Sequence, residues 1–199
     1  AGTMGLVQRN AGHPFFHALG ASRLDRTICS PAEDAGWQAI MGKTPGLHPD
    51  DVLESDLVIL WSINAAATSV HFAARAAEAR KRGATVWLVD TYANDTAAMA
   101  DRVILVLARD GLADERFLAA ETVGWPELRA RALAEYGPER VAALTGLAPA
   151  TIEELAHAYA RARAPFIRLG GGLTRYANSA MTVRTITCLP AVAGAWDRR

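Results

Sequence analysis

Short apolar runs alternate with helical patterns along this chain. The clearest case is an apolar run at residues 56–61, an alanine-rich helical pattern that ends at 80–83, and a second apolar run at 84–89. Strand, helix and strand in this order form a βαβ unit, in which the two strands lie parallel. The hydrophobic pattern therefore predicts an α/β protein built on a parallel sheet.

Two further apolar runs, at residues 102–106 and 165–169, have the length and composition of strands. The junction between Val106 and Leu107 is abrupt, because a parallel strand normally needs a loop before its helix. Ser30 is the predicted N-cap of one helix, with Pro31 at its first position. The predicted helices cover residues 6–19, 31–41, 114–120, 125–136, 138–144, 149–162 and 179–193, with one helical turn at 50–54.

Polar residues or glycines follow three of the predicted strands. They are Ser62 and Asn64 after the first, Asp90 and Thr91 after the second, and Gly170, Gly172, Thr174 and Arg175 after the last. Open α/β sheets bind ligands outside the carboxyl ends of their strands. These positions therefore predict a site for a nucleotide-like ligand.

Each of these signals has a functional and a structural interpretation. The Asn64 amide can bond a phosphate, a ribose or a base edge, but asparagine is also a common N-cap. The Asp90 carboxylate suits a ribose diol or a turn. Residues 170–172 allow close approach of a ligand and positive φ, or form a flexible turn, and Arg175 can bind phosphate. The glycine run is neither Gly-x-Gly-x-x-Gly nor a P-loop.

Composition narrows the class of partner. The chain has 199 residues, is 51% hydrophobic and 21% charged, and carries no net charge, so it can bury a core. A neutral chain argues against a nucleic-acid groove or a membrane-surface patch. No apolar run is long enough to cross a bilayer. The compartment, cytoplasmic or periplasmic, stays open.

Cys29 lies directly before a predicted helix, a position that favours the thiolate form. A thiolate is a soft ligand for a heavy transition metal. The alternative is an inert, buried cysteine. Cys188 lies among apolar residues of a predicted helix and is expected in the core. Two cysteines are too few for a disulfide framework or a Cys-x-x-Cys metal site.

Taken in order, these residues resemble the molybdopterin oxidoreductases of the dimethyl sulfoxide reductase family. Trp61-Ser62-Ile63-Asn64 stands where the family usually has Trp-Gly-x-Asn, and Val89-Asp90-Thr91 where it has Ile-Asp-Pro. No single motif is decisive, but the ordered set is specific. The matching positions are residues 1–5, 27–32, 36, 56–64, 79–84, 89–90, 111–114, 117, 122–125, 167–175, 189–191 and 194–196.

The resemblance implies a Rossmann-like sheet flanked by helices in three αβα layers. It implies one region over residues 1–199, with a helical metal-ligand segment at 1–49 and a dinucleotide-binding part at 50–199. It implies a molybdopterin guanine dinucleotide cofactor carrying molybdenum or tungsten, with Cys29, helped by the small residue Gly36, as the metal's protein ligand and catalytic residue. The implied cofactor contacts are Ser62, Asn64, Asp90, Thr91, Gly170, Gly172, Thr174 and Arg175.

The implied activity is two-electron redox chemistry on a small-molecule substrate, with an electron-transfer subunit or domain as partner. The sequence departs from the family in three places. The iron–sulfur segment expected in the full-length parent and the C-terminal domain are absent. A Pro-Gly-Thr-Asp turn and most of a helix are missing between Val106 and Leu107. Asp90-Thr91-Tyr92 replaces Asp-Pro-Arg.

These departures leave two other hypotheses open. One is an incomplete fragment that is inactive alone, through a true deletion at Val106–Leu107 or a segment absent from this sequence. The other is a non-catalytic nucleotide-binding or interaction module with the same frame. The substrate, the metal and the oligomeric state are not determined by the sequence.

Overall fold

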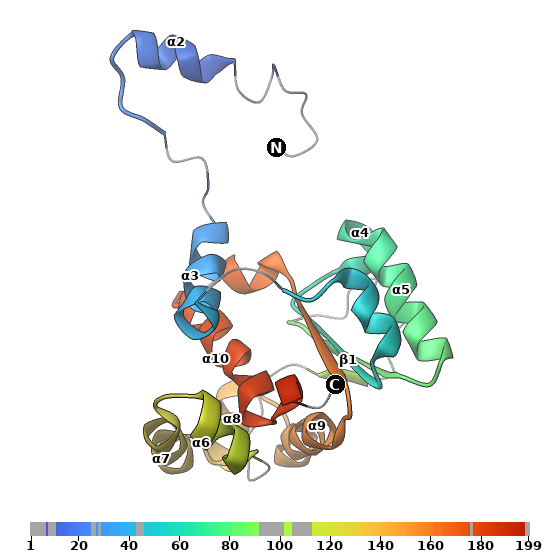
Figure 1. The fold of residues 1–199 in the computed structure, drawn as a ribbon. Coiled ribbons are helices and arrows are strands. Elements are labelled where there is room, and N and C mark those ends of the chain that lie inside the picture. Colours follow the sequence, from blue (N-terminus) through green and yellow to red (C-terminus); the bar gives the residue numbers. More distant parts are fainter. Residues whose placement is uncertain are drawn as a thin grey trace.

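The structure, a computed structural model, describes residues 7, 11–24, 27, 29–42, 46–91, 102–104, 113–175 and 177–197, without the side chains of 102–104, 138 and 197. Within these residues lies a sheet of four parallel strands in the order β3-β2-β1-β4 (Figure 1). The strands are β1 (Leu57–Trp61), β2 (Thr85–Val89), β3 (Arg102–Ile104) and β4 (Pro165–Leu169). The predicted α/β parallel sheet is confirmed.

Both faces of the sheet are buried. Successive strand residues point to opposite faces, and every residue of β1 is buried. On one face Val58, Leu60 and Val86 pack with α5 (Val70–Lys81), among them Phe72 and Ala76. Helices cover both faces, so the predicted three-layer arrangement is confirmed.

The opposite face carries the second cluster. Leu57, Ile59 and Trp87 pack there with Leu155 of α9 (Pro149–Arg161) and with Ile186 of α10 (Ser179–Val192). The α9 apolar positions recur at helical spacing, which explains why this helix was readable from the sequence.

Most predicted helices form within a residue or two of their expected bounds. Two details differ. Of the helix predicted at 6–19, the structure describes α2 only at Gly12–Ala18. Cys29, not Ser30, is the N-cap of α3, and Ser30 is the first residue of that helix. The other helical elements are α2 (Gly12–Ala18), α3 (Ser30–Met41), α4 (Ala65–Thr68), α6 (Glu115–Glu121), α7 (Trp125–Glu135), α8 (Pro138–Thr145) and the 3-10 helices η1 (Pro49–Glu54), η3 (Gly171–Arg175) and η4 (Ala195–Asp197).

Gly36 joins α3 to α10. A Cβ at this position would collide with the carbonyl of Ala180 and would lie 3.0 Å from both the amide nitrogen of Arg184 and Cβ of Val183. Only a residue without a side chain lets the two helix backbones approach this closely. Within the segment predicted at 1–49, helix α3 is thus packed on α10, which covers one face of the sheet.

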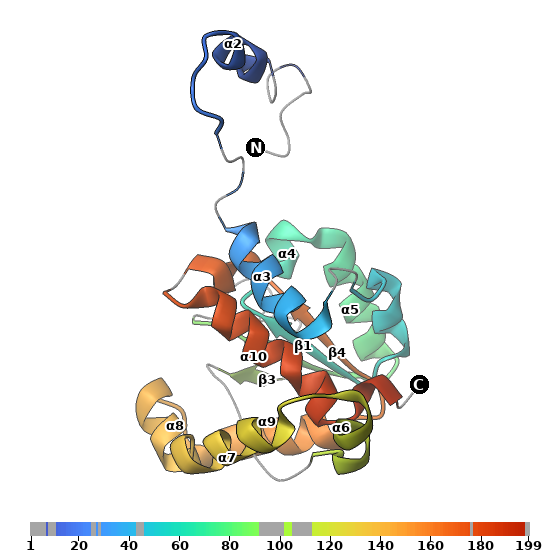
Figure 2. The same cartoon turned by 60° about the vertical axis from the view of Figure 1, so that its left-hand side comes forward.

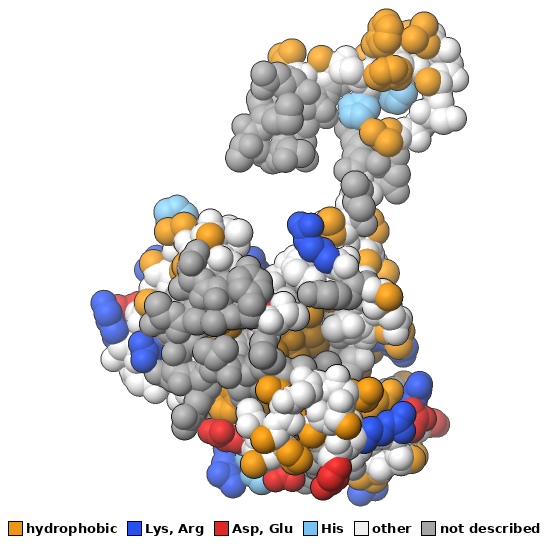
Figure 3. Space-filling model, turned by 180° about the vertical axis from the view of Figure 1, so that it is seen from behind, with side chains coloured by type: hydrophobic (Ala, Val, Ile, Leu, Met, Phe, Trp, Pro, Cys, Tyr) orange, Lys and Arg blue, Asp and Glu red, His pale blue; other side chains and the backbone are white. Residues whose placement is uncertain are grey.

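Helix α2 stands apart from the sheet and buries none of its residues (Figures 1 and 2). Phe15 and Phe16 are 62% and 55% exposed and contact each other edge to face. Figure 3 shows hydrophobic side chains gathered over this segment at the top of the view. On the face drawn there, positive and negative side chains are interspersed over the body of the molecule.

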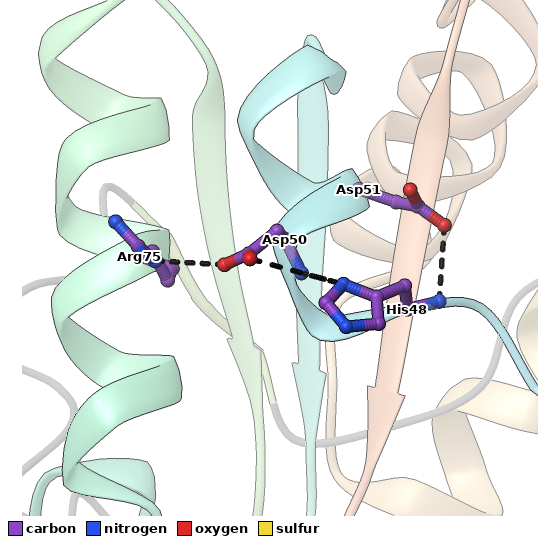
Figure 4. Close-up of polar contacts among 4 residues, drawn as sticks. All are labelled: His48, Asp50, Asp51 and Arg75. Carbon is purple, nitrogen blue, oxygen red and sulfur yellow. Dashed lines mark hydrogen bonds and ion pairs between the residues drawn. The ribbon is translucent and has the colours of Figure 1, made fainter.

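A group of exposed polar side chains fastens η1 to α5 (Figure 4). The amide of Asp50 donates to Nδ1 of His48 at 3.3 Å, and the amide of His48 donates to Oδ2 of Asp51 at 3.0 Å. Nε of Arg75 lies 2.8 Å from Oδ1 of Asp50. These contacts cap η1 and connect it to α5, so His48 has a structural role here.

Residues 105–112 lie outside the described part of the chain, so the predicted Val106–Leu107 junction has no structural outcome. Among the residues that the structure does describe, we find no helix with the length and apolar character needed to span a bilayer.

Candidate functional site

The chain reverses its direction of travel across the sheet between β1 and β4. From β1 it proceeds to β2 and β3 on one side, and it returns to place β4 on the other side of β1. Strands β1 and β4 are neighbours, but the segments that follow them lead away in different directions. Open α/β sheets bind ligands at such a point, outside the carboxyl ends of the strands. Figure 2 shows α4, which follows β1, and η3, which follows β4, at this same end of the molecule.

Ser62 makes the turn out of β1. Its amide donates to the carbonyl of Val89 at 2.7 Å, so the ladder to β2 extends one residue beyond the strand. Its φ is +51°, in the left-handed region that residues other than glycine rarely adopt. The side chain is half-buried.

Gly170 and Gly172 hold the β4 loop against this turn. A Cβ at Gly170 would collide with the carbonyl of Ser62 and lie 2.6 Å from Cβ of Ile63, and a Cβ at Gly172 would lie 2.9 Å from the same carbonyl. The amide of Gly170 also donates to the carbonyl of Trp61 at 2.8 Å. The two glycines allow a close approach, as the sequence predicted. The group that approaches them is the backbone of Ser62 and not a ligand.

Residues 171–175 form the 3-10 helix η3. None of the three glycines has positive φ. Gly171 faces open space. The Thr174 hydroxyl donates to the carbonyl of Gly171 at 2.9 Å, and Arg175 is exposed at the end of the helix. Within the described residues, no ion pair of Arg175 is found, and its guanidinium is available to an anion.

Asn64 occupies the N-cap position of α4, but its side chain makes no capping hydrogen bond. Its carbonyl accepts the first bonds of the helix, from the amides of Ala67 and Thr68. Asn64 therefore stands at the N-cap position, as the capping interpretation requires, but its side-chain amide does not cap the helix. That amide is half-buried, two residues beyond the turn at Ser62.

Asp90 follows β2, one strand away from the point of reversal. Its Oδ1 accepts a 2.7 Å bond from the amide of Thr91 and a weaker one from the Thr91 hydroxyl. Local bonds of this kind are typical of a turn-forming aspartate. The structure therefore supports the turn interpretation of Asp90.

Cys29 caps the first turn of α3 without a side-chain capping bond, and its thiol is free and half-buried. Helix α3 contacts both α10 and η3. Figures 1 and 2 show the first turns of α3 at the end of the molecule where η3 and α4 lie. The thiol is therefore not sealed in the core, and the helix that it precedes packs against η3.

Among the described residues, no group of three or more histidine, cysteine or acidic side chains could hold a metal ion. The His13 and His17 rings lie 6.3 Å apart on α2. Cys188, expected in the core, is half-buried and donates to the carbonyl of Arg184 at 3.3 Å. Burial raises the pKa of its thiol, with an opposing effect of Arg184.

The chain is similar in sequence to known oxidoreductases. No protein-family model matches the chain. A probable oxidoreductase, YoaE of Bacillus subtilis (strain 168), is 37% identical over 211 residues, covering 98% of this chain and 31% of that protein. Formate dehydrogenase H of Escherichia coli (strain K12) is 28% identical over 160 residues, covering 73% of this chain and 22% of the enzyme.

The structure of acetylene hydratase from Pelobacter acetylenicus superposes with a TM-score of 0.73 at 20% identity, covering 94% of this chain and 28% of the hydratase. The fold is therefore that of an α/β protein with a Rossmann-like parallel sheet flanked by helices. The chain belongs to the molybdopterin oxidoreductases of the dimethyl sulfoxide reductase family, and it spans about a third or less of the relatives it matches.

The alignment with YoaE extends over 211 positions, whereas this chain has 199 residues. The relative therefore contains residues that this chain lacks within the matched region. This agrees with an interior shortening. Its location at Val106–Leu107 stays a prediction.

The sequence predicted which polar residues and glycines follow the strands. It did not predict how the backbone positions them. The left-handed backbone of Ser62 was not predicted, because a serine after a strand is usually an ordinary turn or cap residue. The available signal was the glycine that the family usually has at this position, since glycine adopts positive φ readily. The mutual packing of Gly170 and Ser62 joins residues more than a hundred positions apart, which no local pattern reveals.

Proposed function

We propose that this chain forms the part of an oxidoreductase that binds molybdopterin guanine dinucleotide along the carboxyl edge of its sheet. The observation that carries the proposal is the convergence of three segments on one edge: the turn after β1, η3 after β4, and the first turn of α3 with Cys29. The full-length parent would catalyse two-electron chemistry on a small-molecule substrate at molybdenum or tungsten.

The chemistry of the donor groups fits an anionic dinucleotide. Ser62 supplies a hydroxyl and Asn64 an amide whose side chain does not cap α4. Arg175 supplies an exposed guanidinium, which suits bidentate contacts to phosphate. Gly171 leaves its side of η3 open, so a ligand can reach the backbone there.

The remaining predicted contacts have a different role in this proposal. Gly170 and Gly172 shape the edge by packing on Ser62, and Thr174 stabilises η3 through its bond to Gly171. Asp90 and Thr91 form a turn from which the carboxylate would meet the ribose. We therefore assign the direct contacts to Ser62, Asn64, Asp90 and Arg175, with Thr91, Gly170, Gly172 and Thr174 as supports.

Cys29 fits the single protein ligand of a metal whose other ligands belong to a cofactor. A thiolate is a soft donor suited to a heavy transition metal, and the Cys29 thiol is free and half-buried. When bound, the cofactor supplies the redox chemistry, and the chain's residues bind it, orient it and donate thiolate charge. An iron–sulfur segment and an electron-transfer partner are expected in the parent.

The test combines binding to this chain with metal analysis of its parent. Isothermal titration with GDP and with isolated pterin cofactor should give saturable binding that weakens in Asn64→Ala and Arg175→Ala. Metal and pterin content of the full-length protein should fall in Cys29→Ala, and Cys188→Ala serves as the matched control. Unchanged metal content and activity in Cys29→Ala would remove the ligand role.

A non-catalytic nucleotide-binding module is the second candidate. It is favoured by the residues that this chain lacks relative to YoaE, because a shortened frame can keep the nucleotide edge while losing part of the cofactor site. Binding of GDP with no further gain from the pterin would support the module over the enzyme.

A further inference from the structure

Helix α2 ends at a point that its own sequence specifies. Gly20 follows the helix with a φ of +76°. Its amide donates to the carbonyl of His17 at 3.1 Å, and the amide of Ala21 donates to the carbonyl of Phe16 at 3.1 Å. These two bonds form a Schellman motif, in which a left-handed glycine terminates a helix. The sequence therefore encodes α2 as a defined element of the fold.

Helix α2 lacks the packing that normally stabilises a short helix. It has seven residues, and none of them is buried. Isolated helices shorter than about 12–15 residues are marginal in water, and most helices in proteins depend on packing of their apolar side. The helix stands apart from the sheet and its covering helices (Figures 1 and 2). Its stability thus requires a surface that the described part of the chain does not supply.

The apolar residues of α2 form an exposed patch. Leu19 follows Phe15 and Phe16 by four and three positions, so the three share one side of the helical turn. They are 67%, 62% and 55% exposed, and Leu24 in the segment after α2 is 72% exposed. Fully exposed side chains of this size have roughly 150–250 Å² each, so the patch covers roughly 400 Å². An apolar patch of this size marks an interaction site.

A hollow beside this patch offers room for a side chain of a partner. It measures about 240 Å³, and Phe16, His17 and Leu24 are among the residues that line it. Figure 3 shows the hydrophobic side chains and the histidines of this segment together at the top of the view. The shape and the apolar character of this surface fit a protein partner.

We propose that α2 packs, in the full-length parent, against an apolar surface of the polypeptide that lies outside these 199 residues. The match with YoaE covers 98% of this chain and 31% of that protein, so about two thirds of the relative lies outside it. The inference goes beyond the proposed function, because it requires no cofactor.

The size of the patch favours this occupant over a second copy of the chain. A stable interface between separate molecules buries about 800 Å² on each partner, roughly twice the area of the patch. Separate molecules also lose translational and rotational freedom when they associate. A contact within one polypeptide does not carry that cost, so a smaller surface is sufficient.

Amide hydrogen exchange of α2 in the 199-residue chain and in its full-length parent tests the packing. In the chain, the α2 amides should exchange within about tenfold of the rate of an unstructured peptide. In the parent, they should exchange at least about a hundredfold more slowly than in the chain.

The double substitution Phe15→Ser/Phe16→Ser tests the patch itself. Serine and phenylalanine have similar helix propensities, so the change removes apolar surface alone. In the parent, the protection of the α2 amides should fall at least about tenfold. The matched control is the same double substitution in the 199-residue chain, whose unfolding temperature should not change because both side chains are exposed there.

A crosslink identifies the occupant even if the double variant of the parent does not fold. Photoreactive benzoylphenylalanine in place of Phe16 should crosslink to a peptide of the same parent polypeptide, outside residues 1–199. A mixture of heavy-labelled and light-labelled parent distinguishes this product from a crosslink between two copies.

Three results would overturn the inference. The first is exchange of the α2 amides that is equally fast in the parent and in the chain. The second is slow exchange in the chain alone, because residues 1–199 would then already cover α2. The third is a crosslink between two copies or within residues 1–199. None of these results depends on a bound cofactor, so each leaves the proposed function standing.

Discussion

Replacement of Gly170 by alanine tests whether the β4 loop is locked to the turn after β1. The added Cβ would collide with the carbonyl of Ser62 and would lie 2.6 Å from Cβ and 2.8 Å from Cα of Ile63. Two of these three groups are backbone atoms, so no rotation of a flexible side chain can relieve the contact. The strand end or the loop must move.

The expected cost follows from that geometry. Overpacking of a well-packed interior by one methyl group typically costs about 1–3 kcal/mol, and a collision with fixed backbone belongs at the upper end, about 3 kcal/mol. For a domain of this size, about 1 kcal/mol corresponds to a fall of roughly 2–4 °C in the unfolding temperature. Gly170→Ala should therefore unfold about 6–12 °C below the wild type.

The matched control is the neighbouring residue. Gly171 is exposed and has no positive φ, and a Cβ added there would meet no atom within 4 Å. Gly171→Ala should change the free energy of unfolding by no more than about 0.5 kcal/mol. Urea and thermal unfolding of the two variants, monitored by circular dichroism, measure the difference.

An equal stability of Gly170→Ala and Gly171→Ala would refute the reasoning, because the two substitutions differ only in what the methyl group meets. If the β4 loop can move away from the turn after β1 at no cost in stability, these two segments are not fixed to each other in the free protein. A ligand would then have to bring them together.

Three further predictions follow from the packing. Gly36→Ala should lower the free energy of unfolding by about 1–3 kcal/mol, because the added Cβ forces α3 away from α10. Gly46→Ala is the control and should leave this free energy unchanged, because its Cβ would meet open space. Equal denaturant midpoints of the two variants would contradict the prediction. Burial raises the pKa of the Cys188 thiol, so less of its thiolate forms at a given pH. Iodoacetamide should therefore modify Cys29 before Cys188, as followed by mass spectrometry. The reverse order of modification would contradict the burial of Cys188. Asp56→Ala should lower the free energy of unfolding by about 2 kcal/mol, because the Asp56 carboxylate accepts hydrogen bonds from two backbone amides before β4, at 2.8 and 2.9 Å. Asp56→Asn should retain part of this stability. An unchanged urea midpoint in Asp56→Ala would show that these bonds do not stabilise the fold.

The strands were readable from the sequence because burial on both faces demands continuous apolar runs. Residues 57–61 satisfy that demand without help from distant parts of the chain, and every one is buried. The helices were readable for the same reason, since α9 places Ile152, Leu155 and Tyr159 on one buried face. The predictions were less accurate at helix ends. Cys29 and not Ser30 is the N-cap of α3, and the helix predicted at 6–19 is described only as α2 at Gly12–Ala18.

The sequence also placed polar residues after the strands, and the parallel sheet then required the ends of β1 and β4 to be neighbours. It could not assign their individual roles. Asp90 bonds to Thr91, and the Asn64 side chain does not cap its helix, although both residues had the same two interpretations beforehand. Which role applies depends on the position of a few donor atoms, and composition does not encode that.

By itself, the sequence determined which segments become strands and helices, because local apolar periodicity decides what each segment can bury. The tertiary structure alone decided the strand order, the left-handed turn at Ser62 and the purpose of Gly170 and Gly172. The reason is physical: these features arise where backbone from distant parts of the chain meets at van der Waals distance. Such contacts come from the packing of the whole molecule and have no local pattern.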